Sequence, residues 1–118
     1  MSLSDITPCV SVEFLCGRSL GKVALNENMV RVLREIDAAG SVNKAAKRLH
    51  MSYSNTLRSI AAVEKALGIS LVKRSQGPVG STLTDDGRCL ISYFERAQEQ
   101  TQQYADALMS GWEGERDE

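Results

Sequence analysis

The sequence has few of the residues that carry enzymatic or metal chemistry. Its three cysteines, Cys9, Cys16 and Cys89, form no Cys-x-x-Cys pair, and His50 is the only histidine among 118 residues. Metal sites use such ligands at recurring short spacings, so we predict no metal and interpret the thiols as buried and inert. We find no nucleophile with a neighbouring histidine and no carboxylate pair in a plausible pocket. The sequence therefore predicts neither an enzyme nor a cofactor.

Long apolar runs are also missing, which argues against a membrane span. The chain opens on Met1-Ser2-Leu3 without the regions of a signal peptide, so we expect a cytoplasmic protein. With 42% hydrophobic and 25% charged residues, a chain of this length is expected to form one globular domain. We place that domain at residues 1–110 and an acidic tail at residues 111–118.

Charge is distributed unevenly along the chain. The net charge is -1, yet residues 41–74 hold seven lysines and arginines against Glu64 alone, which leaves this segment at +6. From Ala97 onward there are six acidic residues against Arg116 alone, a net charge of -5. A local excess of positive charge is typical of a nucleic-acid-binding surface.

The basic segment has the pattern of two short helices joined by a turn. Ser41 and Ser52 are good N-caps, Ala45, Ala46 and Leu49 share one helical face, and Gly68 ends the second helix, at about residues 52–67. An earlier helix is expected from Asn26 to Ala39. Strands are expected at residues 10–16, 69–74 and 81–83, the last two forming a wing. The predicted fold is mainly α with a small β component.

The second helix of this pair resembles a recognition helix, whose first turns enter the major groove. Asparagine can bond adenine at two points and arginine can bond guanine at two points. Arg58 could equally contact phosphate, Tyr53 could fold onto the core, and the lysines could be no more than a solvated face. The predicted DNA-binding residues are Ser41, Lys44, Ser52, Tyr53, Ser54, Asn55, Arg58, Ser59, Lys73, Arg74 and Gln76.

A long helix is predicted after Thr84, from residue 85 to 110, about 39 Å in length. Its apolar residues recur at heptad spacing, and a helix of this length cannot cover such a seam within so small a domain. We therefore expect a homodimer. The predicted dimer contacts are Leu90, Phe94, Ala97, Thr101, Tyr104 and Leu108.

The motif from Gly40 to Arg74, followed by a glycine-containing wing and the Leu83-Thr84-Asp85-Asp86-Gly87 sequence, resembles the winged helix-turn-helix of LysR-type regulators and of the related molybdate-responsive ModE-like regulators. The resemblance covers residues 26–108. Leu57 departs from ModE-like proteins, which often carry tryptophan there, and the segment Ser75 to Ser81 is shorter than their wing. Neither family's effector domain fits in the remaining residues, so molybdate sensing is not carried over.

The resemblance implies a prokaryotic, dimeric regulator of transcription that binds double-stranded DNA. An alternative function is a protein interaction module, in which the acidic end and the long helix bind a partner and DNA affinity is non-specific. Any response to an effector would require a separate sensor protein, which the sequence does not identify.

Overall fold

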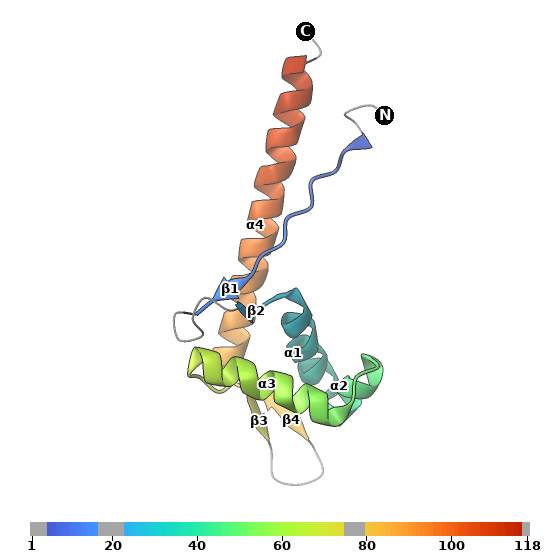
Figure 1. Cartoon of the computed structure of the whole chain (residues 1–118), viewed down its shortest axis with the longest axis vertical. Coiled ribbons are helices and arrows are strands. Elements are labelled where there is room, and N and C mark those ends of the chain that lie inside the picture. The colour runs from blue at the N-terminus through green and yellow to red at the C-terminus, as the bar shows by residue number, and fades with distance from the viewer. Residues whose placement is uncertain (1–4, 17–22, 75–79, 117–118) are drawn as a thin grey trace.

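The computed structural model describes residues 5–16, 23–74 and 80–116 (Figure 1). A short hairpin, β1 (Phe14–Leu15) and β2 (Val23–Leu25), leads into three helices, α1 (Glu27–Ala39), α2 (Val42–Arg48) and α3 (Tyr53–Leu67). A second antiparallel pair, β3 (Val72–Arg74) and β4 (Ser81–Leu83), forms the wing and aligns Val72 with Leu83. The last helix, α4, extends from Asp85 to Arg116. The predicted fold class, a winged helix-turn-helix followed by a long helix, is confirmed.

The helix boundaries follow from local chemistry. The side chains of Asn26, Ser41 and Ser52 each accept a hydrogen bond from the backbone N–H three residues later, at 2.9 to 3.1 Å. Such caps satisfy amide groups that have no partner inside the helix. Gly40 and Gly68 end α1 and α3 with positive φ, a conformation that costs glycine little. The caps predicted from the sequence are therefore confirmed.

The core consists of two adjoining clusters. One joins α1 and α3 to the wing and the start of α4, and the other holds α1, α2 and α3 together. The first cluster contains Leu25, Val30, Leu33, Val63, Leu71, Leu83, Ile91 and Phe94. The second contains Val32, Ile36, Val42, Ala45 and Ile60. Small side chains at Ala45 and Ala46 allow α2 to pack closely, as the sequence predicted.

Residues 8–12, which we call the arm, lie in an extended conformation beside α4 (Figure 1). Gln102 accepts a hydrogen bond from the Val10 N–H at 2.8 Å and donates one to the Pro8 carbonyl at 2.6 Å. Gln98 makes the same pair of contacts with the Val12 N–H and the Val10 carbonyl. Four helical residues rise about 6 Å and two extended residues about 6.6 Å, so successive glutamines match alternate residues of the arm.

Several sequence predictions were wrong. Only Phe14 and Leu15 of the predicted strand at 10–16 are paired, because β2 lies opposite those two residues alone. The first wing strand begins at Val72 rather than Ile69. α4 continues past Ser110 to Arg116, since Gly111 costs a helix only about 1 kcal/mol. Cys9 and Cys89 are exposed and Cys16 is half-buried, so the thiols are not buried as predicted.

Phe94 is a further correction. The sequence predicted a dimer contact, but Phe94 is 2% exposed and belongs to the core of its own chain. Its ring meets the Phe14 ring edge to face, with centroids 5.2 Å apart. Leu90 is half-buried against the same cluster. The first half of the heptad seam is therefore covered within one chain.

Candidate nucleic-acid interface

The outer face of α3 is polar and open to solvent. Tyr53, Ser54, Asn55 and Arg58 are exposed, while Thr56, Ile60 and Val63 are buried on the opposite face. The Thr56 hydroxyl donates to the Ser52 carbonyl at 2.8 Å, which satisfies its polar atom inside the core. Among the predicted α3 residues only Ser59 departs from this pattern, since it is half-buried beside Met29 and Met51.

The exposed stripe of α3 is longer than the predicted site. Ala61, Ala62 and Lys65 are also exposed, and Ser54, Arg58, Ala61 and Lys65 follow one another at spacings of four, three and four. Residues at these spacings share one helical face. Sequence reasoning left out the second half of the helix, although the same spacing identifies it. The two alanines leave room for another molecule to approach the α3 backbone.

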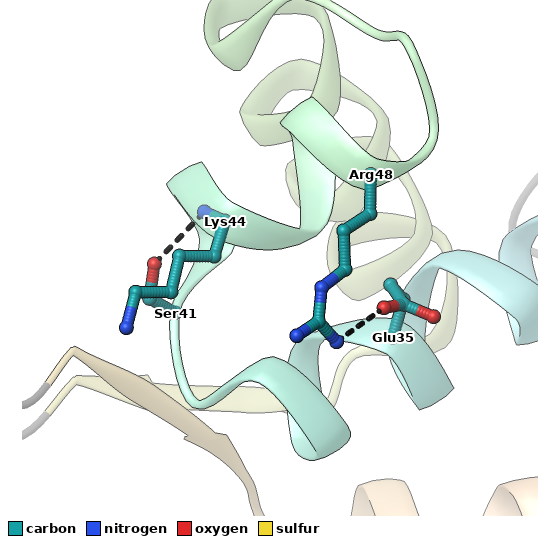
Figure 2. A network of polar contacts seen from close by, with 4 residues as sticks. All are labelled: Glu35, Ser41, Lys44 and Arg48. Carbon is teal, nitrogen blue, oxygen red and sulfur yellow. Dashed lines mark hydrogen bonds and ion pairs between the residues drawn. The ribbon is translucent and has the colours of Figure 1, made fainter.

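Two of the predicted site residues are caps. The Ser41 hydroxyl accepts from the Lys44 N–H at 3.0 Å, and the Ser52 hydroxyl accepts from the Asn55 N–H at 3.1 Å. Figure 2 shows the Ser41 contact at the start of α2. Each hydroxyl retains its own proton as a donor. Both serines therefore fix the helix starts and can still contact an acceptor.

The cations of α2 divide into free and paired groups. Arg48 turns toward α1, and its guanidinium bonds the Glu35 carboxylate at 2.9 Å (Figure 2). Lys44 projects from the same helix near Ser41 and is exposed. In the described parts of the chain, Lys44, Lys47, Arg58, Lys65, Lys73 and Arg74 form no ion pair. Of the seven cations counted in residues 41–74, six remain available to a polyanion.

The wing lies beside both helices of the motif. Arg74 of β3 lines a groove with Leu57 and Ala61 of α3 and Val42 of α2. The Ser81 N–H of β4 donates to the Gly40 carbonyl at 2.9 Å, which fixes the wing next to the start of α2. Lys73 and Arg74 are both exposed, whereas Gln76 lies outside the described residues. The free cations thus surround the open face of α3.

Other kinds of site find no support in the described residues. No group of three or more His, Cys, Asp or Glu side chains there is arranged to hold a metal ion. No helix in those ranges is both long enough and apolar enough to cross a bilayer.

Residues 28–88, which contain the three helices and the wing, match the family described as bacterial regulatory helix-turn-helix protein, lysR family. The chain belongs to the lysR family. The matched segment includes every predicted DNA-binding residue and ends in the first turn of α4.

Curated relatives agree with this family assignment. A probable RuBisCO transcriptional regulator from Phaeodactylum tricornutum is 30% identical over 87 residues, which are 74% of this chain and 28% of the relative. The molybdenum transport protein ModE from Azotobacter vinelandii is 31% identical over 88 residues, which are 72% of this chain and 33% of ModE. This lysR-family chain therefore spans about a third or less of these relatives.

A solved structure shows the same fold. The DNA-binding domain of CbnR, crystallised as a complex with DNA, is 28% identical and superposes with a TM-score of 0.57. The match covers 74% of this chain and 98% of the CbnR domain. A second structure, of CbnR described as a LysR family transcriptional regulator, gives a TM-score of 0.56 and is matched over 28% of its length.

Proposed function

We propose that this chain binds double-stranded DNA as the DNA-binding part of a sequence-specific transcriptional regulator, with α3 in the major groove. The observation that carries the proposal is the exposed face of α3, where Asn55 and Arg58 are free among six unpaired cations. The lysR family and the DNA complex of the CbnR domain support the same function. Family membership also supports a regulator rather than an enzyme, acting in the cytoplasm.

The proposed contacts divide by chemistry. Lys44, Lys73 and Arg74 lie at the border of the α3 face, where they would contact phosphates and fix the orientation of the domain. Tyr53, Asn55 and Arg58 lie on the first two turns of α3, where they would reach base edges. Affinity is then mainly electrostatic, while base preference comes from α3.

The test is selection of bound sequences from a random DNA pool at two salt concentrations. We expect a defined motif at both, with weaker binding at the higher salt because counterions compete for phosphates. Binding that depends on salt but recovers no motif would contradict the proposal and favour the protein interaction module.

In the same selection, Arg58→Ala is expected to relax the preference at one base position and to weaken binding by about 1 to 3 kcal/mol. The reason is that a guanidinium can bond guanine at two points and alanine cannot. Arg96→Ala is the matched control, because Arg96 is exposed on α4 and its loss changes the net charge equally. An unchanged motif for Arg58→Ala would remove Arg58 from the base-reading residues.

We further propose that the distal half of α4 pairs with α4 of a second copy. Tyr104 is 68% exposed and Leu108 58% exposed, and Thr101 is also exposed on the same stripe with half-buried Ala97. The arm covers the neighbouring face at Gln98 and Gln102 and leaves this stripe open. A two-fold pair would present two α3 helices to half-sites about 34 Å apart.

Tyr104→Asp is expected to give a folded monomer, because a carboxylate in the proposed seam would lose its water without gaining a partner. Gln103→Asp adds the same charge at an exposed position outside the stripe and should leave the dimer unchanged. Light scattering measures both masses. A Tyr104→Asp dimer would eliminate the seam as the interface.

A further inference from the structure

Glu64 is the single acidic residue among seven cations in residues 41–74. It lies near the end of α3, where the helix dipole makes a carboxylate unfavourable. A negative charge beside a DNA-binding face would also repel phosphates. Neither helix stability nor attraction to DNA therefore accounts for a carboxylate at this position.

The contacts of Glu64 are with the start of the wing. Its Oε2 atom accepts from the Leu71 N–H at 2.7 Å and lies 3.4 Å from both the Val72 N and the Ser70 Oγ. Leu71 is fully buried, and its carbonyl accepts from the Thr84 N–H at 2.9 Å. One carboxylate thus connects α3 to the entry of β3, and Leu71 continues the connection to the start of α4.

The wing cations follow this connection directly. Lys73 and Arg74 come two and three residues after Leu71, in a strand of only three residues. Glu64 and Arg74 line the same groove, together with Leu57 and Ala61 of α3. Because β3 is short, a shift at its entry would move both cations relative to Arg58.

We propose that Glu64 is a positioning residue for DNA binding, which holds Lys73 and Arg74 at a fixed place beside the recognition helix. The inference rests on the proposed function, since it assigns those two cations to phosphates. Glu64 itself touches no DNA. It makes α3 and the wing one rigid unit, so that base and phosphate contacts form together.

Two substitutions separate the reach of the side chain from its charge. Glu64→Gln keeps the length and an acceptor oxygen but loses the charge. Glu64→Asp keeps the charge but shortens the side chain by about 1.5 Å, which takes the 2.7 Å contact beyond hydrogen-bonding distance. The measurement is affinity for the selected DNA at several salt concentrations, below the melting temperature of each variant.

We expect Glu64→Gln to bind within about twofold of the unchanged protein, and Glu64→Asp to lose about one to two phosphate contacts from the salt dependence, at about 0.9 in slope for each. The opposite order, with tighter binding by Glu64→Gln and unchanged binding by Glu64→Asp, overturns the inference, because it is the result of charge repulsion alone. If Glu64→Asp does not fold, Glu64→Gln decides by the same criterion.

The double variant Lys73→Ala, Arg74→Ala distinguishes this inference from the proposed function. In its background Glu64→Asp should have no further effect on the salt dependence. If the double variant alone leaves the salt dependence unchanged, the proposed role of the wing cations fails. If the double variant reduces the salt dependence and Glu64→Asp does not, only the positioning role of Glu64 fails.

Discussion

Replacing Phe94 with alanine is expected to lower the free energy of unfolding by about 3 to 5 kcal/mol, the range for a large aromatic residue removed from a packed core. Phe94 is 2% exposed and contacts the Phe14 ring, so the substitution leaves a cavity between α4 and the β1 hairpin. Domains of this size have a stability of only about 5 to 15 kcal/mol. Urea denaturation monitored by circular dichroism measures the loss.

The same experiment on Tyr104→Ala is the control. Tyr104 lies on the same helix and is 68% exposed, so its loss should change the free energy of unfolding of a dilute, monomeric sample by less than about 0.5 kcal/mol. Equal effects of the two substitutions would contradict the division of the heptad seam into a part inside the domain and a part outside it.

Gly80→Ala is expected to be the other strongly destabilising substitution, with a cost of about 3 kcal/mol or more. Gly80 has φ +86°, and an added Cβ would lie 2.2 Å from the Gly40 carbonyl oxygen and 2.9 Å from the Ser41 Cβ. The cost combines backbone strain of about 1 to 3 kcal/mol with overpacking of about 1 to 3 kcal/mol. Thermal denaturation should show a markedly lower melting temperature.

Gly40→Ala separates these two contributions. Gly40 also has positive φ, at +74°, but an added Cβ would meet no atom within 4 Å. Only the strain remains, and we expect a cost of about 1 kcal/mol. A Gly80→Ala variant as stable as Gly40→Ala would mean that the wing can move away from the start of α2.

Local signals in the sequence predicted much of this fold. The caps at Asn26, Ser41 and Ser52 and the glycine ends of α1 and α3 depend on residues only a few positions apart. The exposed first turns of α3 follow equally from helical spacing. Whether those exposed residues contact DNA, and whether α4 pairs with a second copy, stay predictions.

Distant contacts explain where the sequence predictions failed. The heptad pattern is the same along both halves of α4, and only Phe14, eighty positions earlier in the chain, distinguishes Phe94 from Tyr104. Gln98 and Gln102 lie off the seam and look like solvated residues until the arm is placed beside them. Glu64 likewise gains its partners only when the wing folds back against α3.

The manner in which α4 holds the arm has a consequence for its evolution. Gln98 and Gln102 bond only main-chain atoms of the arm, and the side chains of Cys9 and Ser11 face solvent. Substitutions at those two positions can accumulate without weakening the attachment. Proline at position 10 or 12 cannot, because it removes an N–H that a glutamine needs. Related chains could therefore keep this architecture while the wording of the arm itself becomes unrecognisable.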